Sequence, residues 1–168
     1  MASETLGRAH SIVVRSIYME HLAYIDEYST LVAADREHTW AALVRVLRGQ
    51  LKGGGPLARV LGASPSRCSG DWSGDLSGAT MPGFAVSTTE PPLRLDLRGH
   101  HRFARYALIF ELEASGDGMT RVRARTLADF PGLVGKLYRA LVIGTRAHRV
   151  IVRRMLWRIQ RIATARAR

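Results

Sequence analysis

Apolar and polar residues follow a helical period along the last part of the chain, from Phe130 to Arg168. Pro131 stands where the first turn of a helix would begin, and its missing N–H has no partner to lose there. At about 100° per residue, one face collects apolar side chains and the other faces are rich in arginine. The apolar positions are Leu133, Val134, Leu137, Leu141, Val152, Met155, Ile159 and Ile162. The pattern predicts one long amphipathic helix whose apolar face is covered by another element.

A period of two replaces the helical period between residues 83 and 128. Four segments alternate in this way, at 84–88, 93–98, 103–114 and 119–128, and turn signals such as Gly116-Asp117-Gly118 separate them. They predict an antiparallel meander with one apolar and one polar face. The residues expected on the apolar face of its last two strands are Tyr106, Leu108, Phe110, Leu112, Val122, Ala124, Thr126 and Ala128.

The first half of the chain predicts a strand followed by two short helices. Residues 25–33 are rich in strand-forming side chains, and Asp35 is a suitable N-cap for the helix that follows. A second, shorter helix is expected at 57–61, and residues 64–81 form either a loop or short strands. Residues 1–24 leave two alternatives, a loose extension or a short helix, so we expect a single domain at 25–168.

The predicted order is a strand, two short helices, an antiparallel meander and one long C-terminal helix. An apolar sheet face and an apolar helix face bury each other, which favours an α+β domain of two layers. Three stretches of sequence carry a further resemblance: Ile25–Ala33 with Asp35 and Trp40, Leu95–Tyr106, and Thr126–Gly132. With these stretches in this order, the chain resembles the START/polyketide-cyclase-like helix-grip superfamily (SRPBCC), in which a curved antiparallel sheet wraps around a long C-terminal α-helix.

The resemblance implies an apolar cavity between the helix and the sheet. Members of the superfamily bind lipids, sterols, polyketides or aromatic compounds; some are cyclases or hydrolases, and many bind without chemistry. Small inward residues such as Ala124, facing large ones such as Phe110, leave room for such a ligand, unless the helix sits closer and fills the space. The expected ligand-binding residues are His148, Tyr106, Leu141, Thr126, Phe110, Val152, Trp40 and Ala124.

His148 is the most informative single residue, because it projects from the apolar face of the predicted helix. Its ring could bind a ligand or act as a general base, or it could be a core histidine bonded to Tyr106, Thr126 or a backbone carbonyl. The superfamily has no universal catalytic set, and the sequence contains no positive evidence for catalysis, so no catalytic residue is assigned. A cyclase or dehydratase that uses His148 and Tyr106 is the alternative to simple binding.

The net charge of +11 is concentrated in the predicted C-terminal helix. Ten of the 25 basic residues and none of the 14 acidic residues lie from position 130 onward. Three interpretations remain open: a solvated face that meets a second subunit or the N-terminal segment, binding to an anionic membrane surface, and binding to nucleic acid. No recognisable nucleic-acid-binding module supports the last. The surface residues concerned are Arg146, Arg149, Arg153 and Trp157, with Ile143 and Val150 on the same side.

The remaining chemistry of the sequence is sparse. Cys68 is the only cysteine, so there is no disulfide framework and no zinc-type cysteine pair. His100 and His101 point to opposite faces of a strand, and no third ligand at suitable spacing completes a metal site. No apolar run approaches the length of about 20 residues that a membrane span needs. We therefore expect a cytoplasmic protein that has no metal or cofactor and that binds a small apolar ligand.

Overall fold

The structure, a computed structural model, describes residues 22–50, 62–142 and 147–166. The side chains of Gln50, Leu141, Val142 and Ala147 also lie outside this description. The predicted short helix at 57–61 and nearly all of the N-terminal segment at 1–24 lie outside the described residues.

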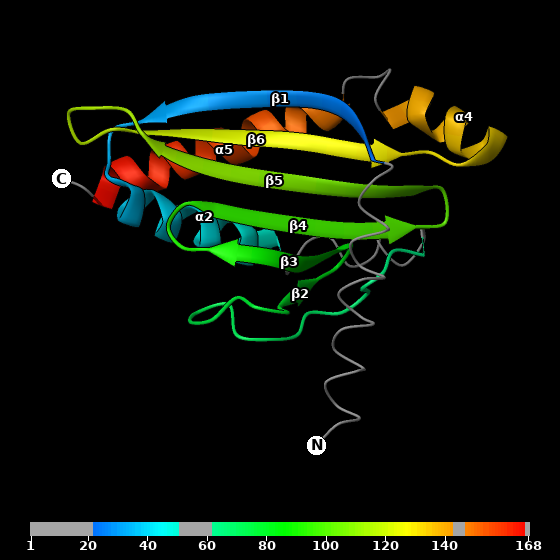
Figure 1. Ribbon diagram of the computed structural model, residues 1–168, viewed down its shortest axis with the longest axis horizontal. Helices are drawn as coiled ribbons and strands as arrows, with labels where there is room; N and C mark the ends of the chain where they lie inside the picture. The colour runs from blue at the N-terminus through cyan, green and yellow to red at the C-terminus, as the bar shows by residue number, and fades with distance from the viewer. Residues whose placement is uncertain (1–21, 51–61, 143–146, 167–168) are drawn as a thin grey trace, which may run out of the picture.

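Within these residues, six strands form one antiparallel sheet in the order β1-β6-β5-β4-β3-β2 (Figure 1). Each strand from β3 to β6 pairs with the next along the chain, so the predicted meander is confirmed. The early strand is also confirmed, and it pairs with the last strand of the meander. The strands are β1 (Ala23–Val32), β2 (Thr80–Met81), β3 (Phe84–Glu90), β4 (Arg94–His101), β5 (Ala104–Ala114) and β6 (Thr120–Asp129).

Buried and partly exposed residues alternate along β6, which identifies the inner and outer faces of the sheet. Val122, Ala124 and Ala128 are buried on the inner face, whereas the arginines between them lie on the outer face. On that outer face Arg125 Nε donates to Glu27 Oε2 at 3.0 Å. Arg94 likewise donates to Asp96 and Glu111. The outer face therefore carries paired charges, and Glu27 and Glu111 form ion pairs with arginines there.

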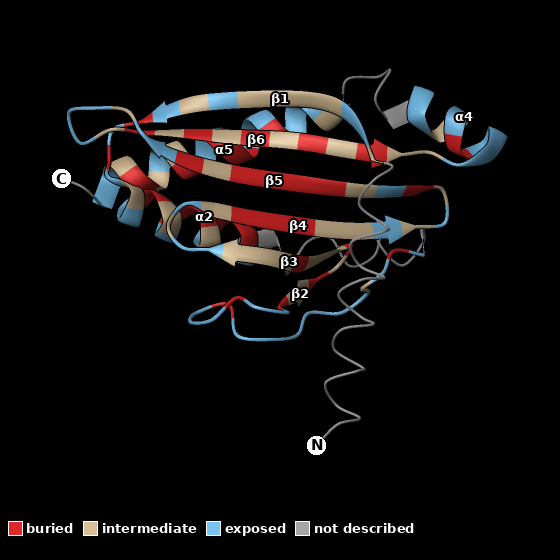
Figure 2. Ribbon diagram, in the orientation of Figure 1, coloured by how far each residue is buried: buried red, intermediate tan, exposed pale blue. Residues whose placement is uncertain are grey.

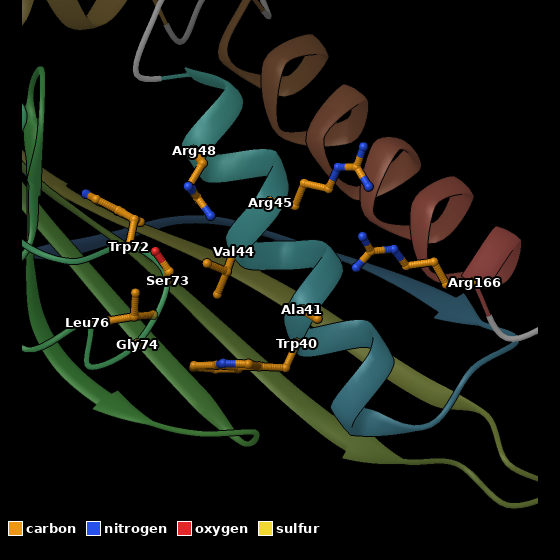
Figure 3. Close-up of a pocket in the computed structure, with 10 residues that line it drawn as sticks. All are labelled: Trp40, Ala41, Val44, Arg45, Arg48, Trp72, Ser73, Gly74, Leu76 and Arg166. Carbon is orange, nitrogen blue, oxygen red and sulfur yellow. The ribbon is translucent and has the colours of Figure 1, made fainter.

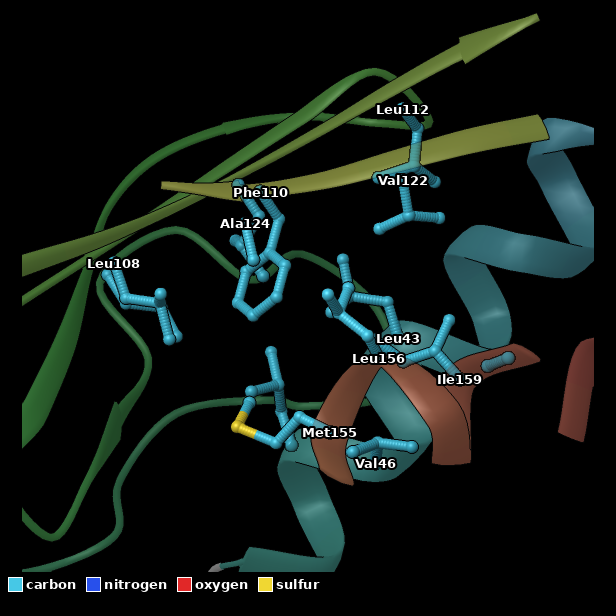
Figure 4. Close-up of a cluster of buried hydrophobic side chains, with 14 of the residues drawn as sticks. Leu43, Val46, Leu108, Phe110, Leu112, Val122, Ala124, Met155, Leu156 and Ile159 are labelled. Carbon is cyan, nitrogen blue, oxygen red and sulfur yellow. The ribbon is translucent and has the colours of Figure 1, made fainter. Parts of the chain in front are cut away.

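Two helices cover the inner face of the sheet, α2 (Arg36–Gln50) and α5 (Ala147–Arg166), and they pack against each other (Figure 1). The start of α2 is capped as the sequence predicts, because Asp35 Oδ1 accepts a hydrogen bond from the His38 backbone N–H at 2.8 Å. The core lies between these helices and the sheet, as the buried residues in Figure 2 show. Its members include Leu43 of α2, Phe110 of β5 and Ile159 of α5 (Figure 4).

The prediction of one long C-terminal helix is wrong in its first half. The structure has two helices there, α4 (Gly132–Val142) and α5, and α4 stands at one end of the sheet, away from the core (Figure 1). Leu133, Val134 and Leu137 were expected on the buried face, but they are 83%, 60% and 72% exposed. Residues 143–146, between the two helices, lie outside the described residues.

The packing of α4 explains why its apolar face points outward. Among residues 132–140 of this helix Gly135 alone is buried, and a Cβ there would lie 2.7 Å from the Phe130 carbonyl carbon and 3.1 Å from the Phe103 carbonyl oxygen. The helix therefore approaches the sheet through its glycine side, where backbone contacts backbone. Tyr138 lies on the same side, so the leucines on the opposite side remain exposed.

Candidate functional site

A polar cluster lies where the first turn of α5 meets the inner face of the sheet. His148 Nε2 is 2.9 Å from Thr126 Oγ1 and 3.4 Å from Asp26 Oδ1. The pairing of β1 with β6 places Asp26 directly opposite Thr126, after a register shift between Tyr24 and Asp26. The side chains of His148 and Asp26 are 20% and 18% exposed, so the cluster is largely withdrawn from solvent.

The carboxylate in this cluster is incompletely satisfied. Asp26 Oδ1 is buried and has no hydrogen-bond partner within the part of the chain that the structure describes. The imidazole of His148 lies at ion-pair distance from this oxygen. A buried oxygen that lacks a hydrogen bond costs free energy, which a ligand hydroxyl could recover by donating to it.

Apolar side chains surround this cluster on the side of the core. Val152 follows His148 by one helical turn and is buried, and Ala124 precedes Thr126 on the same face of β6. Phe110 lies opposite Ala124 on β5. The structure thus brings together four of the residues expected at the ligand site, with a polar end at His148 and Thr126 and an apolar side at Val152 and Ala124. Phe110 was also expected there, but it lies deeper, in the packed core.

Tyr106 lies on the inner face at a separate position, in an aromatic cluster near α4. Its hydroxyl donates to the Gly83 carbonyl oxygen at 2.9 Å. The ring of His101 is 5.5 Å from that of Tyr106 and 4.7 Å from that of Tyr138, measured between centroids. Burial, and after it the charge of His100, lowers the pKa of His101, and burial alone raises the pKa of Tyr138. His101 therefore reaches the inner face, while His100 is exposed on the other.

The ionisation of Tyr106 predicts a loss of stability in alkali. Burial, with a smaller contribution from Tyr138, raises the pKa of Tyr106 from 10.0 to about 12. Below pH 10 both folded and unfolded chains keep the proton, so this group does not change the free energy of unfolding. Between about pH 10 and 12 the unfolded chain loses the proton first, and we expect stability to fall by about 2 kcal/mol. Urea unfolding across this range should show a shallower pH dependence for Tyr106→Phe; parallel curves would contradict the assignment.

Two further residues expected at the ligand site lie elsewhere or are not described. Trp40 is on α2, where it lines a groove with Trp72 outside the polar cluster. The backbone of Leu141 belongs to α4, and its side chain lies outside the described residues.

The surface residues of α5 make contacts within the chain. Arg149 Nε donates to the Tyr28 hydroxyl at 2.7 Å, and the guanidinium carbon of Arg153 is 5.2 Å from the Tyr28 ring centroid. Trp157 is 52% exposed, and Arg161 stacks on its ring at 5.3 Å. Val150 is also exposed, whereas Ile143 and Arg146 lie outside the described residues. Two of the expected surface arginines thus hold α5 against β1.

Sequence patterns alone did not single out Asp26, because its strand is recognised by its content of strand-forming residues rather than by clean alternation. The register shift beside it changes the phase of β1, which no pattern in the sequence reveals. Within residues 22–50, 62–142 and 147–166, no group of three or more histidine, cysteine or acidic side chains could hold a metal ion. No helix in the same residues is long and apolar enough to cross a membrane.

Comparison with known proteins finds this architecture among solved structures. No family model matches the sequence, and no curated protein matches it. Solved structures do match. A conserved protein from Geobacillus kaustophilus is 14% identical with a TM-score of 0.50, and the match covers 83% of this chain and 94% of that one. The protein TTHA0849 from Thermus thermophilus is also 14% identical with a TM-score of 0.50, over 84% of this chain and 98% of that one.

A third solved structure adds a di-domain protein to this group. The di-domain ARO/CYC StfQ from the steffimycin biosynthetic pathway is 11% identical with a TM-score of 0.50. The match covers 87% of this chain and 50% of StfQ. The chain has the helix-grip fold. In this helix-grip domain α5 is the gripped helix, and the resemblance noted in the sequence is confirmed at the level of the fold.

Proposed function

We propose that this helix-grip domain binds a small hydrophobic ligand, of lipid, polyketide-like or aromatic type, at the N-terminal end of α5. The observation that carries the proposal is the polar cluster of His148, Thr126 and Asp26 at the edge of an apolar inner face. Ligand sites are mostly apolar surfaces with a few polar groups that fix orientation. The shared fold with StfQ, an ARO/CYC of a biosynthetic pathway, supports a ligand of this general kind.

We infer the position of the ligand from the exposure of the side chains between the sheet and the helices. Leu43, Phe110 and Ile159 have no exposed surface between the sheet and the helices, so these described residues pack against one another and do not line a ligand site. The first turn of α5 is different, because His148 and Asp26 keep some exposure there. We expect the hydroxyl or carbonyl of the ligand to contact His148 and Asp26, the two side chains of the cluster that keep some exposure.

An enzyme of the cyclase or dehydratase type is the second candidate, favoured by the imidazole beside a carboxylate. His148 would act as the general base or acid, and Asp26 would stabilise its charged form. Tyr106 was the partner expected from the sequence, but its hydroxyl donates to Gly83, and the groups beside His148 are Thr126 and Asp26. In this case His148→Ala would retain the bound molecule and abolish its conversion.

The first experiment is native mass spectrometry of the protein purified gently from the cells that express it. We expect an apolar molecule, released on denaturation, and saturable fluorescence of the neutral probe N-phenylnaphthylamine. Asp26→Asn should weaken probe binding by about tenfold, because the N–H of the probe would lose its carboxylate acceptor. Arg158→Ala, on the exposed side of α5, is the matched control and should bind as the unmodified protein does. A folded protein that carries no apolar molecule and shows no saturable probe binding would refute the proposal.

A further inference from the structure

A groove lies apart from the polar cluster, on the side of α2 that faces the loop before β2 (Figure 3). Its volume is about 540 Å³. α2 contributes one wall, the loop around residues 72–76 contributes the other, and Arg166 at the end of α5 closes it. The residues of the polar cluster do not line this groove, so a ligand bound here would be independent of the function proposed above.

The walls of the groove are aromatic and apolar. Trp40 and Val44 are one turn apart on α2 and project toward the loop that carries Trp72 and Leu76 (Figure 3). Trp72 is held in place, because its Nε1–H donates to the Thr80 carbonyl oxygen at 3.2 Å and its side chain is buried. The partly exposed indole ring of Trp40 thus offers a flat apolar surface to an aromatic ligand, and the edge of the Trp72 ring, fixed to the edge of the sheet, forms the wall beside it.

Three arginines line the same groove: Arg45 and Arg48 from α2, and Arg166 from α5. None of them has an ion-pair partner among the residues described. Asp71 is an acidic group close enough to sense Arg48: its pKa is lowered mainly by the hydrogen bond from the Ser73 backbone, and Arg48 adds a small electrostatic contribution. Arg45 and Arg166 have no such counter-charge within the described part of the chain, so the α5 side of the groove carries uncompensated positive charge.

We propose that this groove binds a small organic anion with a flat aromatic body, such as an aromatic carboxylate. A guanidinium group binds a carboxylate through two parallel N–H···O bonds, and the indole rings contact the apolar body. Inorganic phosphate would leave the tryptophan walls unused, and a neutral aromatic compound would leave the arginines unpaired. The combination of both surfaces in one groove selects the amphipathic anion.

Ala41 provides a way to block the groove without disturbing the core. It lines the groove, and its small side chain is exposed on the surface of α2 between Trp40 and Arg45. Glutamate is a good helix former, so Ala41→Glu should fold normally while it adds bulk and negative charge where the anion would lie.

The test measures binding of naphthoate and of its neutral isostere naphthamide to the full chain by isothermal titration. We expect saturable binding of naphthoate, about tenfold weaker binding of naphthamide, and weaker binding of naphthoate at high salt. Ala41→Glu should abolish naphthoate binding. Arg45→Gln combined with Arg166→Gln should weaken it about tenfold without changing the affinity for naphthamide. Arg158→Gln removes a charge from the exposed side of α5 and should have no effect.

Three results would overturn the proposal. The first is the absence of saturable naphthoate binding in the millimolar range. The second is equal affinity for naphthoate and naphthamide, because the arginines would then contribute nothing. The third is naphthoate binding that survives Ala41→Glu but is lost in His148→Ala. That result would place the anion at the polar cluster and leave the function proposed there intact.

Discussion

Replacement of Phe110 by alanine is expected to lower the free energy of unfolding by about 3–5 kcal/mol. Phe110 has no exposed surface, and it is flanked on the sheet by Leu95 of β4 and Ala124 of β6. Met155 and Leu43 approach it from the helices (Figure 4). Because these neighbours are fixed in different elements, they cannot collapse into the space that the ring leaves. Urea denaturation of the variant measures the change.

The same variant decides between two roles for this residue. Phe110 was expected to line a ligand site, whereas the structure places it in the packed centre of the core. Phe110→Leu keeps most of the apolar volume and should cost clearly less than Phe110→Ala. A loss below about 1 kcal/mol for Phe110→Ala would mean that the ring borders an open cavity rather than a filled core.

Substitution of Gly99 by alanine is expected to destabilise the fold by about 3 kcal/mol or more, because the new methyl group would have no space. A Cβ at this position would overlap the carbonyl oxygen of Gly83 and lie 2.7 Å from Cε2 of Tyr106. Both neighbours are constrained, since the Tyr106 hydroxyl donates to that same carbonyl. Relief would require the chain around Gly83 to move away from β4 and break this hydrogen bond.

A second glycine provides the matched control. Gly49 lies in α2, where an added Cβ would meet open space, and its backbone does not require glycine. Gly49→Ala should therefore stabilise the protein by up to about 1 kcal/mol. Thermal unfolding of both variants gives the comparison. Equal and small effects at Gly99 and Gly49 would contradict the close approach of Gly83 to β4.

Local patterns in the sequence were sufficient to predict the sheet and the capped start of α2. Alternation in β5 and β6 assigned the inner face correctly, down to Val122 and Ala124, because a strand has only two faces. The pairing of β1 with β6 had no local signal, since it joins segments far apart in the chain. Neither the local patterns nor the resemblance to a known fold led to a prediction of this pairing.

Helical periodicity gave a less complete answer. It grouped Leu133 and Leu137 with the core residues of α5. The helical period shows which side chains share a face of a helix, but it does not show whether another element covers that face. The informative signal was Gly135, whose lack of a side chain sets the side on which α4 packs. The same limit applies to Trp40: the period placed it on an apolar face of α2, but it could not reveal the separate groove beside Trp72.

Two of the three residues of the polar cluster, His148 and Thr126, were predicted from the sequence, and Asp26 was not. His148 was conspicuous as a polar residue on an apolar helical face, and Thr126 was among the partners considered for it. Asp26 was missed because its position depends on a register shift, which arises from the pairing of two strands rather than from either sequence.

The pairing between β1 and β6 also determines when the sheet can be completed during synthesis. Ala23 pairs with Ala128, and Val32 pairs with Thr120, so β1 finds its strand partner in the described sheet near the end of the domain. The ribosome releases β1 long before β6 exists, and until then the backbone groups of β1 lack the strand with which they pair. Contacts between such distant segments slow folding, because a long loop must close before they form. The strand that is made first can join the sheet only after the last strand has been made.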